Sequence, residues 1–225
     1  MRSSNNGFCG FSPEMVSFLF ELKFSNTIDK QAENLKKYKR LISEPLILLY
    51  DDLLETVLDL GLSVETKLSR CVSTPYTDRR FSPQAPLKEY MYIRFKQLGK
   101  KTDIPGLYFD MGIDHYGYGI RIYKQTSSGM GKLREQIKEE PQKFSAAIEK
   151  ISSAGFAIIG EKYKIDHFPE ISECKAKEIL NRRSFYIEKA VPVSDTVFSS
   201  ALAEELSCAY RQINNFYQLL VEGLR

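Results

Sequence analysis

The sequence predicts an α+β fold, a single domain in which N-terminal helices and a long C-terminal helical segment pack on a mostly antiparallel central sheet. Apolar residues recur at helical spacing in the N-terminal third of the chain, and from Lys67 the period of the pattern changes to two. Helical spacing then returns and dominates the last part of the chain. Helices, consecutive strands and then mixed elements form an order typical of α+β proteins.

The chain has 225 residues, of which 43% are apolar and 27% charged, and this is within the range of one large domain. At this size, folding buries about 70–75% of the surface of the unfolded chain, so the core needs no disulfide or metal. No internal repeat or low-complexity linker divides the sequence. We therefore expect one domain over residues 1–225, with residues 1–10 as a flexible tail.

Helices are predicted throughout the N-terminal third. The first has a clear start signal, with Ser12 as N-cap and Pro13 at the first helical position. The apolar residues that follow at helical spacing are Met15, Phe18, Leu19 and Leu22. A second helical stretch covers residues 30–42, and a longer helix follows Pro45 and stops near Gly61.

Four segments rich in aromatic and β-branched residues, separated by loops that contain proline or glycine, predict strands. They are residues 67–73, 89–97, 106–113 and 116–124. The last two join through residues 114–117, a predicted hairpin turn. Because short loops connect strands that run in opposite directions, we expect a mostly antiparallel sheet.

The rest of the chain mixes helices and strands. Helices are predicted over residues 129–139 and 141–152, a strand within 154–165, a short helix over 173–180 and a strand over 184–192. Ser194 or Asp195 is predicted to cap the C-terminal helical segment. Its main part, residues 200–224, carries an apolar stripe made of Leu202, Leu206, Ala209, Ile213, Phe216, Leu220 and Leu224.

The positive charge is concentrated in one segment. The net charge of the chain is only +3, which does not by itself indicate nucleic-acid binding. Between residues 67 and 101, however, nine cations face two carboxylates, Asp78 and Glu89. The nine are Lys67, Arg70, Arg79, Arg80, Lys88, Arg94, Lys96, Lys100 and Lys101. They form either a solvated surface or an anion-binding site.

Alternation along the strand at residues 89–97 predicts a polar, aromatic face and a core face. Lys88, Tyr90, Tyr92, Arg94 and Lys96 share the first, and Glu89, Met91, Ile93 and Phe95 the second. Gly117 and Gly119, in a neighbouring predicted strand, leave room for another backbone or a ligand to approach. If Arg70, Arg80, Lys88 and Arg94 converge there, the ligand is anionic, because guanidinium groups bind carboxylate or phosphate in a bidentate manner.

No catalytic template is present. The sequence has neither GxSxG nor HExxH, and His115 and His167 lie in no recognisable triad or dyad. Asp110 and Asp114 flank a predicted strand end, a weak signal for acid–base or metal chemistry. We assign no catalytic residue, no metal ligand and no cofactor, and whether the chain is an enzyme stays open.

The four cysteines, Cys9, Cys71, Cys174 and Cys208, are scattered without a CxxC pair, which argues against a zinc site and favours free thiols. No stretch has the apolar length of a signal peptide or a membrane span. We expect a soluble cytoplasmic protein with no membrane partner.

The chain resembles the bacterial proteins of domain-of-unknown-function family 2461 in the order of its segments, which include "FSPEMVSFLFEL", "ENLKKYKRLISEPL", "PGLYFDMGIDHYGYGIRIY", "KLREQIKEEPQKF", "NRRSF" and "VPVSD". The resemblance runs from Phe11 over nearly the whole chain. The basic core of the family, Arg-Asp-x-Arg-Phe-Ser with an Arg before it and a Lys after it, matches Arg70, Asp78, Arg80 and Lys88. The loop before Asp78 is longer here, and residues 30–31 lack an aromatic pair typical of the family. The resemblance implies a fold and a site position, and no activity.

Three functions remain open. The first is the binding of a small anionic or phosphorylated ligand on the basic and aromatic sheet face. The second is nucleic-acid binding, with Tyr90, Tyr92 and Tyr118 stacking on bases. The third is a scaffold role towards an acidic protein partner. Arg183 either completes the basic site or, like its neighbour Arg182, supports a helix C-terminus. The predicted ligand-binding residues are Arg70, Asp78, Arg80, Lys88, Arg94, Tyr118 and Arg183.

Overall fold

The centre of the protein is a five-stranded antiparallel sheet with the strand order β1-β2-β3-β5-β4. The computed structural model describes residues 7–27, 29–77, 86–169, 171 and 174–224. The strands are β1 (Met91–Lys96), β2 (Ile104–Met111), β3 (His115–Tyr123), β4 (Ala157–Ile159) and β5 (Tyr186–Pro192). The predicted strands at 89–97, 106–113, 116–124 and 184–192 are therefore confirmed. The fold is α+β, with the antiparallel sheet that the sequence predicts.

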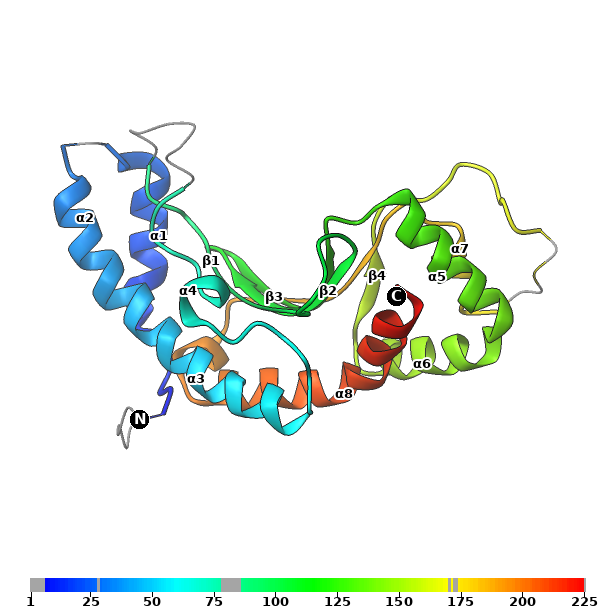
Figure 1. Ribbon diagram of the computed structural model, residues 1–225. Coiled ribbons are helices and arrows are strands. Elements are labelled where there is room, and N and C mark those ends of the chain that lie inside the picture. Colours follow the sequence, from blue (N-terminus) through cyan, green and yellow to red (C-terminus); the bar gives the residue numbers. More distant parts are fainter. Residues whose placement is uncertain (1–6, 28, 78–85, 170, 172–173, 225) are drawn as a thin grey trace.

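Helices from both ends of the chain support one face of this sheet (Figure 1). The N-terminal helices are α1 (Pro13–Ser25), α2 (Gln31–Tyr38) and α3 (Glu44–Asp59), with a π-helical turn at Lys39–Ser43 between the last two. The long C-terminal helix α8 (Ala201–Gly223) contacts α3 and lies against β2 and β3. The remaining helical elements are α4 (Leu68–Cys71), α5 (Ser127–Glu139), α6 (Pro141–Ser153), α7 (Lys177–Leu180) and a 3-10 turn at Asp195–Phe198.

Alternation along the strands divides the sheet into two chemically different faces. Ile93, Phe95, Leu107 and Phe109 point to the helix-covered face and are completely buried. Glu205 of α8 reaches the same face and accepts hydrogen bonds from two strand tyrosines. This face belongs to the hydrophobic core, which continues into α1, α3, α5 and α6.

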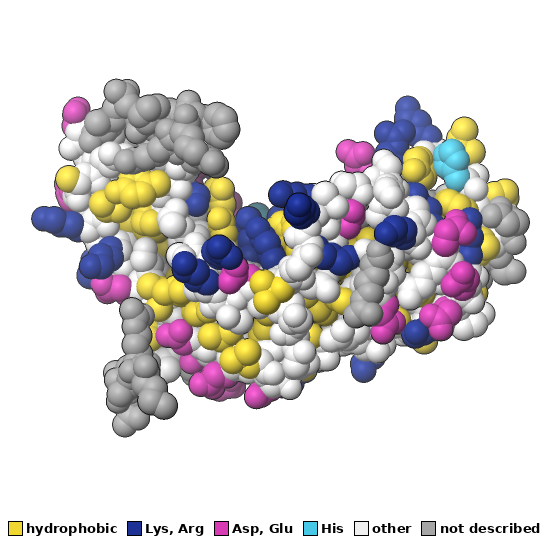
Figure 2. All heavy atoms as spheres, viewed as in Figure 1, with side chains coloured by type: hydrophobic (Ala, Val, Ile, Leu, Met, Phe, Trp, Pro, Cys, Tyr) yellow, Lys and Arg dark blue, Asp and Glu magenta, His cyan; other side chains and the backbone are white. Residues whose placement is uncertain are grey.

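The opposite face, called the open face below, is hollow along its middle (Figure 2). Helices α1 and α2 rise at one end of the sheet, and α5 and α7 rise at the other. Figure 2 shows Lys and Arg side chains gathering in the hollow between these two ends. The layers of the fold thus leave a broad concave surface whose floor is the sheet.

Three local predictions need correction. Residues 67–73 do not form a strand, because Leu68–Cys71 make one helical turn and only Val72 forms an isolated bridge, to Ile93 of β1. His115 is the first residue of β3 rather than part of a turn, and the hairpin closes through a hydrogen bond from Gly112 N–H to the His115 carbonyl. Of the predicted tail, Phe8 is buried, and its N–H donates to Asp52.

Candidate functional site

The strand register arranges the open face in rows that run across the sheet. One row joins Arg94 of β1, Tyr108 of β2, Gly119 of β3 and Glu188 of β5. The row on one side holds Tyr92, Asp110 and Gly117, and the row on the other side holds Lys96, Gly106 and Arg121. Charged and tyrosine side chains therefore surround a floor that is partly bare backbone.

Arg94 is the central cation of this face. Its guanidinium carbon lies 3.6 Å from the centroid of the Tyr92 ring and 5.6 Å from that of Tyr123. Within the described residues, no carboxylate forms an ion pair with Arg94. Lys88 lies on the same ring, with Nζ 5.3 Å from the Tyr92 centroid, and donates to the Thr74 carbonyl at 3.0 Å. Stacking on Tyr92 thus brings two cations together.

Lys88 and Arg94 also influence each other electrostatically. Burial, and then the charge of Arg94, lower the pKa of Lys88 from its ordinary value. The same two causes lower the pKa of Lys96, whose Nζ lies 4.5 Å from the centroid of the Tyr123 ring. Mutual repulsion of this kind is relieved when an anion binds between the cations.

Arg121 differs from Arg94 because it already has an acidic partner. It pairs with Asp110 at 3.1 Å, and its guanidinium carbon lies 4.4 Å from the Tyr108 ring and 5.1 Å from the Tyr186 ring. Burial raises the pKa of Asp110, although the Arg121 charge opposes that shift. The pair and the two rings form a partly buried polar layer next to Arg94.

Gly117 allows two carboxylates to approach the middle of the floor. A Cβ on Gly117 would lie 2.5 Å from Oε1 of Glu188 and 3.3 Å from Oδ1 of Asp110. The Glu188 carboxylate therefore lies flat over β3, in the space that any larger residue would fill. The room that the glycines of this strand leave is filled by the protein itself, by the Glu188 carboxylate over Gly117 and by the Ile187 carbonyl of β5 at Gly119.

Two tyrosine hydroxyls on this face are buried: that of Tyr108 lies beside the Arg121 guanidinium, and that of Tyr123 has no hydrogen-bond partner in the described part of the chain. Nε of Arg121 is also buried without a hydrogen-bond partner among the described residues. Burial raises the pKa of both tyrosines well above the ordinary value, so both are neutral and able to donate. Buried polar groups normally have partners, and an accumulation of unpaired ones marks a place where a ligand or water supplies them.

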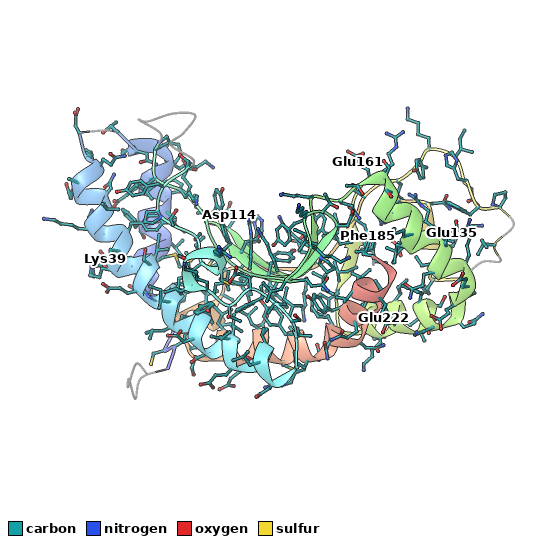
Figure 3. All side chains as sticks on the ribbon, in the orientation of Figure 1. Lys39, Asp114, Glu135, Glu161, Phe185 and Glu222 are labelled. Atoms are coloured by element: carbon teal, nitrogen blue, oxygen red, sulfur yellow. The ribbon has the colours of Figure 1, made fainter. Side chains whose placement is uncertain are left out.

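A pocket of about 730 Å³ opens where this layer meets the end of the sheet near α5. Its walls include Arg94, Arg121 and Tyr186, together with the apolar side chains of Ile159 and Phe185. Figure 3 shows Phe185 and Glu161 at this end of the sheet and Asp114 towards the other. This volume is within the range of small-molecule sites, about 300–1,000 Å³.

The structure brings together only part of the predicted site. Lys88 and Arg94 share the Tyr92 ring, as described above. Arg70 pairs instead with Glu65 at 2.6 Å and lines a separate pocket with Lys96. Arg183 lies 5.5 Å from the Tyr163 ring, beyond the end of the open face. Two further predicted residues, Asp78 and Arg80, lie outside the described residues.

Tyr118 is a correction, because its side chain points to the helix-covered face. It is completely buried and its hydroxyl donates to Oε1 of Glu205 at 2.7 Å. It lies one residue from Gly117 and Gly119 and therefore on the opposite side of the strand. Arg182 is also buried, and it donates to the Gly160 and Ile158 carbonyls and pairs with Glu178, so it joins β4 to α7.

The predicted set omitted most of the polar layer. Alternation places Arg121 and Tyr123 on the same face as Gly117 and Gly119, and that signal is present in the sequence. Glu188 carries no such signal, because its position depends on the pairing of β5 with β3. The residues missed are Tyr108, Asp110, Arg121, Tyr123, Tyr186 and Glu188.

The described residues contain neither a group of metal ligands nor a membrane-spanning helix. No three His, Cys, Asp or Glu side chains in these ranges are grouped so that they could hold a metal ion. Likewise, none of the helices in the described ranges has the length and apolar character needed to cross a membrane.

Comparison with protein families places the chain in one of them. The model of a family described as conserved hypothetical protein (DUF2461) matches residues 14–219 of the 225-residue chain. A search of curated proteins finds no match. The family match covers every strand of the sheet, and so it includes the whole open face.

Proposed function

The chain thus belongs to the DUF2461 family of conserved hypothetical proteins, whose description names no activity, and we propose that it binds a small anionic ligand on the open face. The observation that carries this proposal is Arg94. Arg94 is half-buried as a residue, and its guanidinium is held by the Tyr92 ring and has no ion pair among the described residues. An oriented guanidinium without an acidic partner is well suited to bind carboxylate or phosphate.

The surroundings of Arg94 support a small ligand. Lys88 adds a second cation, and the adjoining pocket has the volume of a small-molecule site. Tyr123 contributes a buried hydroxyl that lacks a partner in the described chain. An anion that reaches these groups gains charge-assisted hydrogen bonds, each contributing about 1.5–3 kcal/mol.

Binding of a nucleic acid has less support. That hypothesis used Tyr90, Tyr92 and Tyr118 as stacking platforms, and Tyr118 is buried under α8. The Tyr92 ring is already covered by Arg94. A small anion requires none of these rings to be free, and we therefore favour it.

The four thiols support a cytoplasmic location as part of the proposal. Cys9, Cys71, Cys174 and Cys208 are all free, and Cys9 and Cys208 are exposed. Exposed free thiols persist in reducing compartments and are oxidised in most extracellular ones.

Thermal unfolding with a panel of ligands tests the proposed function. The panel contains phosphates, nucleotides, dicarboxylates and short oligonucleotides, each at low and moderate salt. A small anion at a hundred times its dissociation constant should add about 2.7 kcal/mol to the free energy of unfolding, or roughly 5–10 °C in Tm. A shift produced only by oligonucleotides and removed by salt would instead support the nucleic-acid hypothesis.

Arg94→Met tests the residue that carries the proposal. Methionine keeps much of the apolar stem and removes the charge, so the Kd of the best anion should rise about 10- to 150-fold. Arg40→Met is the matched control, because Arg40 is an exposed arginine that pairs with Glu14 far from the open face. Equal affinity in the wild type and Arg94→Met would overturn the assignment of this face.

A further inference from the structure

The pocket that Arg94 lines is much larger than a simple anion. Its volume is about 730 Å³, whereas a cavity of about 150 Å³ already holds benzene. Inorganic phosphate or a short carboxylate bound to Arg94 would therefore leave most of the pocket to water. The walls away from Arg94 indicate the chemistry of the rest of the ligand.

One wall of this pocket is apolar. Ile159 of β4 is paired with Tyr186 of β5, so their side chains lie next to each other on the open face. Both residues are half-buried, and they line the pocket together with Phe185, which is 3% exposed. Apolar surface that is still partly in water favours a ligand that covers it with apolar groups.

Hydrogen bonds hold this wall in place without a ligand. The buried Arg182 donates to the carbonyls of Ile158 and Gly160, at 2.7 and 2.8 Å. These two carbonyls flank Ile159 in the chain. The ion pair of Arg182 with Glu178, at 2.9 Å, joins this end of the sheet to α7. The wall is therefore preformed, and a ligand binds to it without the entropic cost of ordering it.

Arg94 and the apolar wall belong to different ends of the sheet. Their strands, β1 and β4, are the two outer ones, and the Arg94 guanidinium carbon reaches to 5.6 Å from the Tyr123 ring of β3. Two strand spacings of about 4.8 Å separate β3 from β4, so the wall begins roughly 10 Å from the anion site. Between them the pocket is lined by Arg121 and Tyr186, which pack on each other.

We propose that the ligand of the open face is an amphiphilic anion, whose charged group binds Arg94 and whose apolar body lies against Ile159, Tyr186 and Phe185. The inference rests on the proposed function, because it adds an apolar subsite to the same anion site. The chemical class is a phosphate or carboxylate with an alkyl or aryl body of roughly 10 Å. A polar body, such as that of a sugar phosphate, does not match this wall.

A series of ligands with the same charged group and increasing chain length tests the apolar subsite. Calorimetric titration compares ethyl, butyl, hexyl and octyl phosphate, each below the concentration at which it forms micelles. Every methylene that reaches the wall should lower the Kd about two- to fourfold, because it is removed from water. Glycerol phosphate is the polar counterpart of butyl phosphate and should bind no more tightly than ethyl phosphate.

Ile159→Thr should flatten this dependence on chain length. Threonine keeps the β-branched shape that strands favour and replaces apolar surface by a hydroxyl. The Kd of octyl phosphate should rise about 3- to 10-fold, while that of ethyl phosphate stays unchanged and shows that the variant is folded. Ile165→Thr is the matched control, because Ile165 is 74% exposed and lies outside the lining of this pocket.

The outcomes separate this inference from the proposed function. If the Kd does not change with chain length and Arg94→Met weakens every member of the series, the apolar subsite is rejected and the anion site stands. If chain length lowers the Kd equally in the wild type and in Ile159→Thr, the assignment of the apolar body to this wall is rejected. If none of the four alkyl phosphates binds the wild type, both proposals are overturned.

Discussion

Asp110 illustrates, at the scale of single residues, how burial sets the chemistry of the open face. Burial raises its pKa, and the neighbouring Arg121 opposes that shift at 3.1 Å. We expect its titration, followed by NMR, above the usual value for aspartate of about 3.9. In Arg121→Met the pKa should rise further, because the group that stabilises the carboxylate is gone. A pKa that falls in this variant would contradict the assignment.

The same shift predicts how stability changes with pH. The folded pKa of Asp110 lies above the unfolded pKa, so ionisation of this group opposes folding above the folded pKa. The penalty disappears as the pH falls through that value. Relative to Asp110→Asn, the wild type should therefore gain free energy of unfolding between neutral pH and pH of about 4, measured by denaturant titration. A difference that shrinks on acidification would show the opposite sign.

Tyr118 tests the division of the sheet into two faces. Its hydroxyl donates to the Glu205 carboxylate at 2.7 Å in the core. Tyr118→Phe should lower the free energy of unfolding by about 1.5–3 kcal/mol and leave the affinity for anions unchanged. The matched control is Tyr92→Phe, which removes a tyrosine hydroxyl from the open face and keeps the ring that packs against Arg94. Loss of anion affinity in Tyr118→Phe would place this residue in the site after all.

At the scale of secondary-structure elements, Gly119 allows β3 and β5 to approach each other closely, because it has no Cβ. Its φ is 153°, and a Cβ there would lie 2.1 Å from the Ile187 carbonyl oxygen, which belongs to the backbone of β5. Gly119→Ala should therefore cost about 2 kcal/mol or more in unfolding free energy. Gly117→Ala should cost less, because its nearest neighbour is the end of the Glu188 side chain. Equal losses would mean that β5 can move away from β3.

The elements also differ in how well they could be predicted. The strands at the centre of the sheet have clear alternation, since one side is core and the other polar. Leu68–Cys71 shows the limit, because a seven-residue alternating pattern also fits a helical turn beside one bridged residue. The π-helical turn at Lys39–Ser43 likewise has no distinctive composition.

At the scale of the whole molecule, the candidate site depends on how distant segments meet. Arg94 and Glu188 are far apart in the sequence, and the strand order β1-β2-β3-β5 places them in one row. The helices at the two ends of the open face come from the N-terminal third and from the middle of the chain (Figure 1). Helix α8 supports the floor from below, so the cations can gather above it (Figure 2).

The sequence by itself determined the α+β class, four of the strands and the face on which Arg94 lies, because the period of apolar residues reports local geometry. Tertiary structure alone decided which charged residues converge on the open face. Arg70 pairs with Glu65 and leaves the set, and Glu188 joins it through the pairing of β5 with β3. The physical reason is that a side chain's direction follows from its own strand, whereas its neighbours follow from strand order and register.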